Sequence, residues 1–565
     1  MQNVHEGQII YIICKRCLYK RQKINIAVFV LFSICLFQFT TFAAQDIAVV
    51  CSRPFHASLA TWIRYRSEQG YTVHVIVEPF GSDTVTAQKI KERITEVHRK
   101  TPLAALLLVG RSSEKTVPSP LLPCRIIQQF GTETQLASDD WYADIDEDGL
   151  PDFAVGRFPV ALKNGGGNLP DTAALDSLIQ RTIEYESLPP DVWCRQMQLA
   201  AGVGNFSPLL DSVIESSARY ILSETFPASY ALSLIQADWR SPFCPFPLDF
   251  SAELNQTLDA GALFWVYLGH GTHRQIEPLY LPQGYLPLSL STKSPASGNG
   301  RSVSFLFCCY GGSLDRDTPS LGEELVLSGR SVASVAPSRT AMPYGMSVLA
   351  VEMLQTFVQH QTDSKPLTLG QLMLESKHRV LHPVSGQTSQ PRLRRPVRES
   401  VESFAKMLDP NPQQLPVQLA EHTAMFHLFG DPLLRLPLPH RLEFRCPSRV
   451  RAGQMLRISG QTDIDCRNVD LELLLPLNQI VLRSPQRQDF RNDKSVQQDW
   501  NTEYRKANSR LIERYRAECT GGKFECEIPL PKDLSGNYVI RGFAKTADRF
   551  AVNSVTFRCI ETKAP

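Results

Sequence analysis

Two apolar runs in the sequence each lead into a side chain that can take part in covalent chemistry. Phe264–Leu268 runs into His270, which lies between two glycines, and Val303–Phe307 runs into Cys309. An imidazole beside a thiol assists attack of the sulfur on a carbonyl carbon and can then protonate the departing amine. The glycine at position 271 lets a substrate backbone approach closely. His270 and Cys309 are therefore predicted to form a catalytic pair.

Each of these residues also has a structural interpretation. A histidine beside glycines is more often structural than catalytic when it is taken alone, and a cysteine that ends a buried strand usually packs in the core. Cys308 and Cys309 are adjacent thiols that a metal ion could use, although no nearby CxxC or HxxxH pattern supports such a site. His273 competes with His270 for the catalytic role, but it lies further beyond the strand.

The pairing of these residues requires strands that end at a common edge. Strand-length apolar runs alternate with helical patterns from residue 45 onward, which predicts an α/β fold with a largely parallel sheet covered by helices. Ligands bind at the carboxyl edge of such sheets. The expected strands are Asp46–Cys51, Tyr71–Val77, Leu103–Val109, Gln198–Val203, Ala262–Leu268, Val303–Phe307 and Val332–Ala336, and the expected helices lie near residues 57–69, 85–99, 208–223 and 320–328.

The chain is long enough for several domains, because its 565 residues exceed the roughly 100–200 of a usual domain. We expect two successive α/β units at residues 45–195 and 196–438 and a C-terminal domain at residues 439–565. Short alternating stretches in the last unit predict a small antiparallel β-sandwich. A charged insertion, Arg483–Arg516, interrupts it and is expected to be partly helical. Residues 385–417, rich in Pro, Arg and Gln, are expected to form an excursion outside the core.

Residues 1–44 have the order of a secretory signal peptide. Basic residues precede an apolar run, Ile24–Phe42, and the small residues Ala43 and Ala44 follow it. An uncleaved membrane anchor is the alternative, because a bilayer requires an apolar run of about 20 residues. The chain is therefore expected to be secreted or to stay associated with the cell envelope.

The composition excludes some classes of protein. Lys and Arg number 59 against 57 Asp and Glu, so the net charge of +2 gives no support for nucleic-acid binding. Removal of the signal peptide takes Cys14, Cys17 and Cys35 from the 14 cysteines, so an odd number remains and at least one thiol cannot pair internally. Pairs among the cysteines of the C-terminal domain would stabilise an exported domain of this size.

An acidic run matches part of a calcium-binding loop. Asp144, Asp146 and Asp148 alternate, a glycine takes the sixth position, and Asp152 follows. This is the first half of an EF-hand loop, but the twelfth position is a valine, so a complete EF-hand is excluded. A structural Ca²⁺ site is expected here, with a solvated acidic turn as the alternative. No organic cofactor is expected.

The blocks around His270 and Cys309 resemble those of the gingipain family of caspase-like (clan CD) cysteine peptidases. In that family one strand ends in His-Gly and the next ends in a small residue followed by the nucleophilic cysteine, so Cys308 matches the small residue and Cys309 the nucleophile. Three further blocks are similar to family motifs, and the resemblance covers residues 45–438. These blocks are Ala137–Asp144 through Gly156–Val160, Ser320–Leu325, and His427–Pro432.

The resemblance implies an endopeptidase that acts through a thioester. Cys309 would attack the peptide carbonyl, and His270 would protonate the departing amine. The N–H groups of Gly271 and Cys309 would form the oxyanion hole. The implied fold is two caspase-like subdomains followed by an immunoglobulin-like β-sandwich, and the implied partners are protein or peptide substrates.

The resemblance also suggests a preference for a basic residue before the cut. Arginine-specific members use an acidic residue in an Asp-x-Trp context after a helix that ends in Thr-Ile-x-Tyr-Glu. Here Thr182–Glu186 is followed by Asp191 and Trp193, so Asp191 is the candidate, with an ordinary solvated loop residue as the alternative. A carboxylate can hold a guanidinium through two hydrogen bonds. Arg339, in a segment that lacks the family's pocket tryptophan, would oppose this preference.

Two other classes of function are kept as alternatives. One is a catalytically silent relative that serves as a surface-binding module, against which the intact His270 and Cys309 argue. The other is a processing transpeptidase that resembles the sortase of the type IX secretion system. Products that carry an added amine would distinguish the transpeptidase from a hydrolase.

Overall fold

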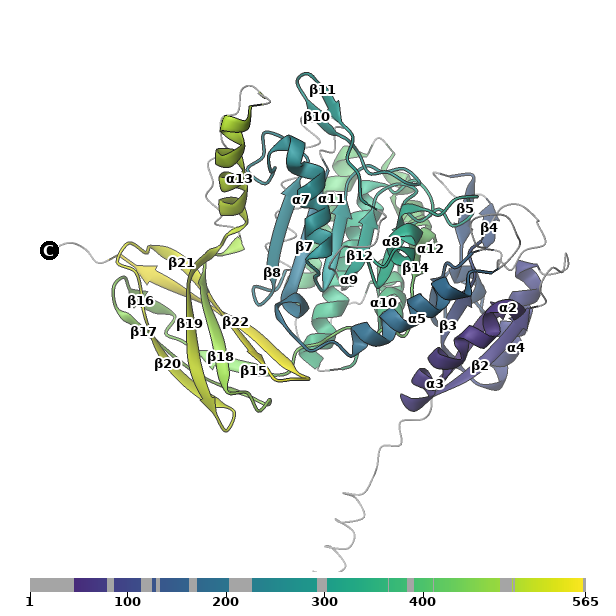
Figure 1. Ribbon diagram of the computed structural model, residues 1–565, viewed down its shortest axis with the longest axis horizontal. Helices are drawn as coiled ribbons and strands as arrows, with labels where there is room; N and C mark the ends of the chain where they lie inside the picture. Colours follow the sequence, from purple (N-terminus) through teal and green to yellow (C-terminus); the bar gives the residue numbers. More distant parts are fainter. Residues whose placement is uncertain are drawn as a thin grey trace, which may run out of the picture.

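The chain folds into an α/β body followed by a smaller, mainly antiparallel sheet (Figure 1). The computed structural model describes residues 45–78, 86–112, 124–128, 133–161, 170–202, 226–291, 302–363, 365–383, 391–409, 411–477, 490 and 493–561. The predicted signal peptide, residues 1–44, and the helix expected near residues 208–223 lie outside these ranges.

The body contains one large sheet. Its described strands have the order β2-β1-β3-β6-β14-β13-β12-β9-β7-β8, and neighbours run parallel except for β13 and β14. Each expected strand corresponds to one of them, so the mainly parallel α/β sheet is confirmed. Their bounds are β1 Gln45–Ser52, β2 Tyr71–Glu78, β3 Leu103–Val109, β6 Ala154–Phe158, β7 Gln196–Ala201, β8 Ala231–Gln236, β9 Phe264–Leu268, β12 Val303–Phe307, β13 Ala333–Pro337 and β14 Phe426–Phe429.

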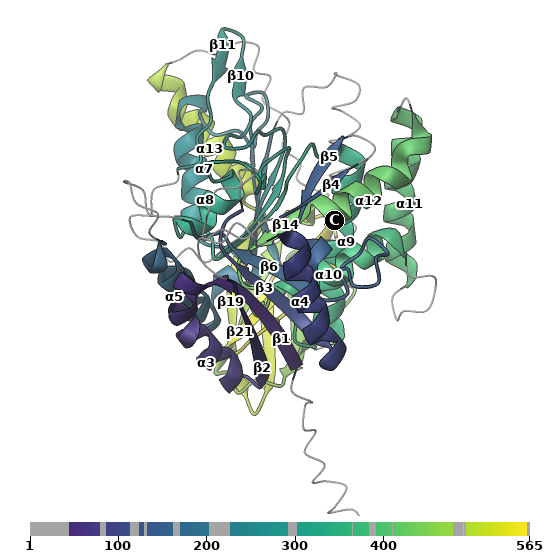
Figure 2. The same cartoon turned by 90° about the vertical axis from the view of Figure 1, so that its right-hand side faces the viewer.

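The short strand β14 joins the two halves of this sheet. Phe429 pairs with Arg157 of β6 on one side and with Ser334 of β13 on the other. Strands from residues 45–195 therefore lie on one side of β14, and strands from residues 196–438 lie on the other. The strands of the two predicted α/β units therefore belong to one continuous sheet, which Figure 2 shows from the N-terminal side.

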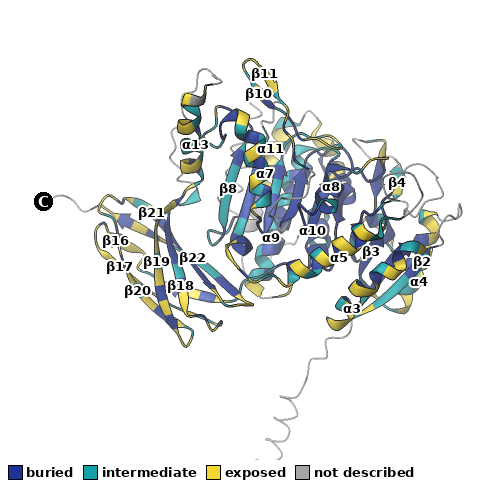
Figure 3. Cartoon of the chain, viewed as in Figure 1, coloured by how far each residue is buried: buried dark blue, intermediate teal, exposed yellow. Residues whose placement is uncertain are grey.

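Helices cover both faces of the sheet. Their apolar side chains pack into clusters with the strand residues, and the strands are mostly buried (Figure 3). One face carries α2 (Arg53–His56), α3 (Ala60–Glu68), α5 (Thr172–Glu186), α7 (Phe250–Asp259) and α8 (Leu321–Leu327). The other carries α4 (Ala87–Lys100), α9 (Pro343–Asp363), α10 (Leu369–Leu381) and α12 (Leu415–Met425). No helix in the described ranges is both long and apolar enough to cross a membrane.

The segment expected to be an excursion is largely helical. Helix α11 spans Pro391–Leu408 and buries Val397 and Val401. The proline and arginine content of this segment therefore does not keep it outside the core.

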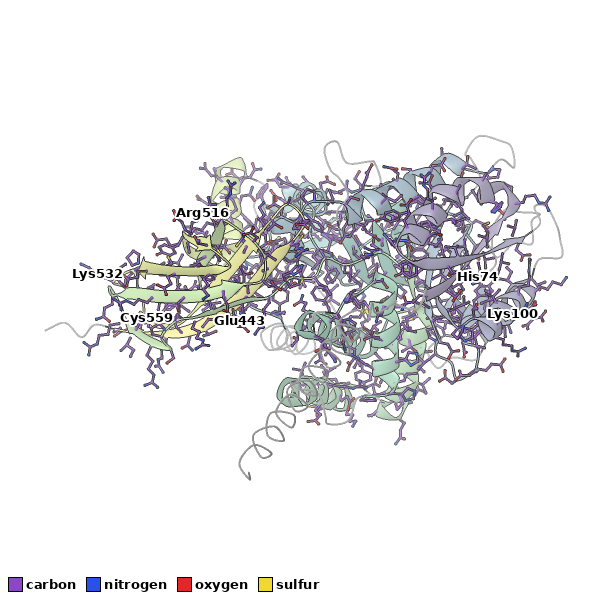
Figure 4. The ribbon with its side chains drawn as sticks, turned by 90° about the horizontal axis from the view of Figure 1, so that it is seen from below. His74, Lys100, Glu443, Arg516, Lys532 and Cys559 are labelled. Atoms are coloured by element: carbon purple, nitrogen blue, oxygen red, sulfur yellow. The ribbon has the colours of Figure 1, made fainter. Side chains whose placement is uncertain are left out.

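The C-terminal part forms a curled sheet in the order β15-β17-β20-β19-β18-β21-β22-β16. Its pairings are antiparallel except for β16 with β22. Its buried side chains form a separate core, and Figure 4 shows it, with Glu443 and Arg516, at the opposite end of the molecule from Lys100. The bounds are β15 Leu442–Arg445, β16 Arg449–Arg451, β17 Met455–Thr462, β18 Asn468–Leu474, β19 Leu511–Thr520, β20 Lys523–Pro529, β21 Gly536–Lys545 and β22 Phe550–Ile560. The expected helical insertion is α13, Lys494–Asn508.

Candidate active site

Strand register brings the histidine and cysteine blocks to the same edge. Strands β9 and β12 are parallel neighbours in which Leu268 pairs with Phe307, and the N–H of Gly269 donates to the carbonyl of Phe307 at 3.2 Å. His270 and Cys309 each follow these paired ends by two residues. The two chemically active side chains therefore leave neighbouring strands at the carboxyl edge of the sheet, where α/β folds bind ligands.

A tight hairpin fixes the backbone of His270. The N–H of Glu277 donates to the carbonyl of His270 at 3.1 Å, and the N–H of Thr272 donates to Gln275 O at 2.8 Å. Gly271 lies between these two bonds and opposite Ile276 as an isolated bridge. In this antiparallel pattern the flanking residues make the ladder bonds, so the N–H of Gly271 points away from the hairpin partner.

Gly271 also lies against the cysteine block. A Cβ placed on Gly271 would be 2.8 Å from both Cβ and Sγ of Cys308 and 3.3 Å from the carbonyl oxygen of Cys309. Since carbon atoms in contact are normally about 3.5–4.0 Å apart, only glycine allows this approach. Cys308 itself is fully buried, so it packs as the small residue beneath the site while Cys309 is half-buried.

The chain turns sharply after Cys309. Tyr310 has a φ of 60°, a left-handed conformation that is uncommon for residues with a side chain. The turn is held by the N–H of Tyr310, which donates to Arg339 O at 3.0 Å, and by the N–H of Gly312, which donates to Pro337 O at 2.8 Å. Unfavourable backbone angles of this kind persist where the surroundings determine them, often at functional sites.

The thiol of Cys309 faces the segment after β13. The N–H of Ala341 donates to Sγ at 3.4 Å, and the S–H can donate to Ala341 O at 3.9 Å. Burial raises the pKa of the Cys309 thiol, and the negative charge of Glu133 adds to this effect although the Ala341 N–H opposes it. The thiol is therefore protonated at neutral pH, and a base must take its proton before it can attack.

Glu133 is a carboxylate of this site that the sequence did not reveal. Its Oε1 accepts hydrogen bonds from Tyr310 Oη at 2.9 Å, from the N–H of Thr340 at 3.1 Å and from Thr340 Oγ1 at 2.5 Å. Burial alone would raise its pKa, but these hydrogen bonds lower the pKa of Glu133 below its ordinary value. A half-buried, ionised carboxylate therefore lies beside the turn that follows Cys309.

Arg339 does not project toward this site as an unpaired cation. It is buried, and its guanidinium donates to the two carboxylate oxygens of Asp315 at 3.0 and 2.6 Å and to Gln135 O at 2.9 Å. Because the charge of Arg339 is paired with that of Asp315, it does not oppose a basic substrate side chain as expected.

Asp191 lies away from this edge. It precedes η3 (Val192–Arg195) and β7, so it lies at the amino end of a strand whose carboxyl end is next to β9. Six residues of β7 separate the two ends by roughly 20 Å. The Asp191 carboxylate is 56% exposed and pairs with Lys545 at 2.9 Å. The structure does not bring Asp191 together with His270 and Cys309.

The acidic loop lies before the amino end of β6. One carboxylate oxygen from each of Asp144, Asp146 and Asp148 lies within 4.8 Å of the others. Asp144 is only 8% exposed, and its Oδ1 atom has no hydrogen-bond partner within the described ranges. Asp152 is not part of this cluster, since its Oδ2 accepts from the N–H of Ile145 at 2.8 Å. Three of the four predicted ligands are thus close together.

The remaining residues that the sequence analysis singled out make contacts that stabilise the fold around the site. The fully buried Arg157 donates to both oxygens of Asp139, at 2.7 and 2.6 Å. Ser320 and Glu323 form a capping box at the start of α8. His273 Nε2 lies 2.9 Å from Thr318 O, so its ring is engaged by the loop that precedes α8.

The sequence of the chain is similar to that of a known peptidase family. The sequence profile of peptidase family C25 matches residues 40–437. The fold is similar to the crystal structure of the Arg-specific cysteine proteinase gingipain R (RgpB), with 15% identity and a TM-score of 0.46 over 92% of this chain and 99% of that one. A complex of Porphyromonas gingivalis RgpB pro- and mature domains gives 14% identity and a TM-score of 0.43 over 91% of this chain and 100% of that one. No curated protein matches the sequence. Since the family profile spans well over half of the chain, the protein belongs to peptidase family C25, the gingipain family, and is a cysteine-type endopeptidase.

Proposed function

We propose that Cys309 and His270 form the catalytic dyad of this endopeptidase. The imidazole takes the proton of the thiol, the sulfur attacks the peptide carbonyl carbon, and the C–N bond breaks as His270 returns the proton to the leaving amine. Water then hydrolyses the thioester. The N–H groups of Gly271 and Cys309 hold the oxyanion. The pairing of Leu268 with Phe307 is the observation that carries this proposal, because it aligns the ends of the two strands.

The dyad is tested with a library of fluorogenic peptides varied at the residue before the cut. The mature protein is assayed under reducing conditions with calcium, beside Cys309→Ala, His270→Ala and Cys526→Ala as a control thiol in the C-terminal sheet. We expect turnover in the wild type and the Cys526 variant and none in the other two. Turnover that survives Cys309→Ala contradicts the proposal.

Water is the proposed acceptor of the acyl group. The alternatives, a transpeptidase and a silent binding module, are distinguished by two additions to the same assay. Mass spectrometry with an added amine detects transfer products, and a thiol-reactive peptide probe detects a reactive Cys309. Hydrolysis products without amine adducts support the peptidase, whereas absence of both turnover and labelling supports the binding module.

We propose that cleavage prefers a basic residue before the cut and that Glu133 holds it. The proposal is supported by the lowered pKa of Glu133 and by its hydrogen bonds to Tyr310 and Thr340, which border the nucleophile. A fixed carboxylate can accept a charge-assisted hydrogen bond from a guanidinium. Asp191 is exposed and paired with Lys545, so it serves as the matched comparison.

Glu133→Gln and Asp191→Asn remove one charge each and test this assignment. We expect Glu133→Gln to lower kcat/KM for peptides with Arg before the cut by about 100-fold while cleavage after Leu changes little, which corresponds to about 3 kcal/mol. Asp191→Asn should leave unchanged the ratio of kcat/KM for peptides with Arg before the cut to kcat/KM for those with Leu. A loss of Arg preference in Asp191→Asn alone would reverse the assignment.

We propose a structural calcium ion at Asp144, Asp146 and Asp148. Alternating carboxylates with a glycine at the sixth position suit the oxygen preference of Ca²⁺. Burial raises the pKa of Asp144, and its Oδ1 atom lacks a hydrogen-bond partner in the part of the chain that is described, as expected of a cation ligand. Asp152 would shape the loop through Ile145 rather than bind the ion.

Thermal unfolding with Ca²⁺, Mg²⁺ or chelator tests the ion site. We expect calcium to raise the unfolding midpoint of the wild type by several degrees and magnesium to have little effect. Asp146→Asn should abolish the increase, and Asp548→Asn, at an exposed position in the C-terminal sheet, should retain it. Equal effects of the two ions, or an intact increase in Asp146→Asn, would refute the site.

We further propose that residues 1–44 are removed on export and that the mature chain is secreted or held at the cell envelope. We also propose that the C-terminal sheet is an immunoglobulin-like sandwich. The basic and apolar order of the N-terminus supports export. The curled antiparallel sheet with its own core supports the sandwich. The mass of the mature chain after export tests the cleavage, with a new N-terminus near residue 45 as the expected result.

A further inference from the structure

Three successive peptide N–H groups beside the nucleophile each donate to a side chain from another part of the chain. The three bonds run from Thr340 to Glu133 Oε1 at 3.1 Å, from Ala341 to Cys309 Sγ at 3.4 Å, and from Met342 to His422 Nε2 at 2.9 Å. The peptide unit that carries the N–H of Met342 also carries Ala341 O, which lies 3.9 Å from Cys309 Sγ. The bond to His422 therefore orients a peptide that faces the thiol.

His422 acts here as a neutral acceptor. It lies in α12 and is fully buried, and burial lowers the pKa of His422 to about 4, so that its ring is uncharged at neutral pH. A neutral imidazole has one N–H donor and one acceptor nitrogen. Nδ1 lies 2.6 Å from Gln418 O, a carbonyl that can only accept, so Nδ1 carries the proton. Nε2 is then free to accept from the N–H of Met342.

Neighbouring elements fix the ring of His422. A Cβ placed on Gly345, near the start of α9, would lie 2.4 Å from both Cγ and Nδ1 of His422. The ring therefore packs on the backbone of α9 in a space that only glycine leaves. Its centroid lies 6.1 Å from that of the Phe426 ring, at the start of β14. These contacts hold Nε2 at the peptide of Met342.

We propose that His422 is a positioning residue that keeps the N–H of Ala341 on the sulfur of Cys309. The inference rests on the proposed role of Cys309 as the nucleophile. The hydrogen bonds of His422 go to backbone atoms, so it acts on the thiol through the peptide that follows Ala341. An N–H that donates to sulfur stabilises the negative charge on Cys309 once the thiol proton has left.

Two amide variants test this role. Asparagine is too short to reach Met342, whereas the Oε1 atom of glutamine can take the place of Nε2. The readout is the rate at which iodoacetamide alkylates Cys309 as a function of pH, because this reaction requires a thiolate but no substrate. Tandem mass spectrometry distinguishes Cys309 from the buried Cys308. Glu133 and Cys308, which also interact with this sulfur, are the same in every variant.

We expect the pKa of the Cys309 thiol to rise by about one pH unit in His422→Asn and to stay near the wild-type value in His422→Gln. Peptide kcat/KM at neutral pH should fall by about tenfold in His422→Asn and change little in His422→Gln. His360→Asn is the matched control, since it removes another buried histidine, which pairs with Glu375 at 3.1 Å within α9 and α10. It should leave the pKa of Cys309 unchanged.

Repeating the alkylation with His270→Ala added separates this inference from the dyad. A pKa rise in His422→Asn that persists there supports the role of His422 even if no peptide is cleaved. An unchanged pKa in folded His422→Asn, or a raised one in His422→Gln, overturns the role even if the wild type is an active peptidase. The glutamine variant decides alone if the asparagine variant does not fold, because a wild-type pKa supports an acceptor at this position and a raised pKa opposes it.

Discussion

Gly271 shows how narrow the tolerance of this site is at the scale of single residues. A Cβ added to Gly271 would lie only 2.8 Å from both Cβ and Sγ of Cys308. The histidine hairpin or the turn after Cys309 would therefore have to move. We expect Gly271→Ala to lower kcat/KM by at least 100-fold and to destabilise the fold by about 1–3 kcal/mol. The double variant Gly271→Ala/Cys308→Gly removes the overlapping atoms and should recover part of both losses. Peptide hydrolysis and urea unfolding measure these effects, and wild-type values in the single variant would show that the site is looser than this contact implies.

The proposed catalytic residues were predictable from the sequence, but the acidic neighbour Glu133 was not. His270 and Cys309 follow apolar strands, so their placement at one edge needs only the parallel sheet. Asp191 precedes its strand, and this order already separates it from the other two. Glu133 has no local signature, because it reaches the site through contacts with Tyr310 and Thr340 that only the folded chain brings together.

At the scale of elements, the four-residue strand β14 depends on the residues that follow it. Asp431 accepts hydrogen bonds from Trp62 and from Arg66, the latter at 2.7 Å, and all three side chains are buried. We expect Asp431→Asn to destabilise the protein by about 2 kcal/mol, because Trp62 and Arg66 lose a buried carboxylate partner, although Arg66 keeps its ion pair with Glu186. Asp470→Asn breaks an exposed pair with Arg516 and should cost less than about 1 kcal/mol. Similar losses in urea unfolding of the two variants would argue against a special role for the buried pair.

Long apolar strands were predictable, whereas the short strand β14 and the helix α11 were not. The expected strands Leu103–Val109 and Val303–Phe307 agree with β3 and β12 at both ends. Strand β14 is too short to give a periodic signal and gains its partners from both halves of the sheet. Helix α11 begins at Pro391, in a basic segment whose composition suggested a loop. The helix forms nevertheless, because side chains such as that of Val397 are buried against the rest of the fold.

At the scale of the whole molecule, buried charges join the C-terminal sheet to the α/β body. Glu472 of β18 accepts from Arg195 of η3 at 3.0 Å and from Arg541 of β21 at 2.8 Å, and Arg541 also donates to Tyr230 O at 3.0 Å. Asn508 of α13 adds two hydrogen bonds with the backbone of the edge strand β8, at Leu234. Domain boundaries drawn from composition cannot reveal such contacts. The C-terminal sheet is fixed to the α/β body by these contacts rather than attached through a free linker.

The pH dependence of stability tests this junction. Burial acts against the charge of Glu472, but Arg541 and Arg195 outweigh it and lower the pKa of this carboxyl from 4.5 to about 2. A depressed pKa means that the stabilisation is complete above the unfolded value and is lost as the pH falls from about 4.5 toward 2. We expect Glu472→Gln to destabilise the protein by roughly 3 kcal/mol at pH 7, and the difference from the wild type to shrink over that acidic range. Urea unfolding at several pH values measures both effects. A difference that stays constant down to pH 2 would mean that packing, rather than the charge of Glu472, joins the C-terminal sheet to the α/β body.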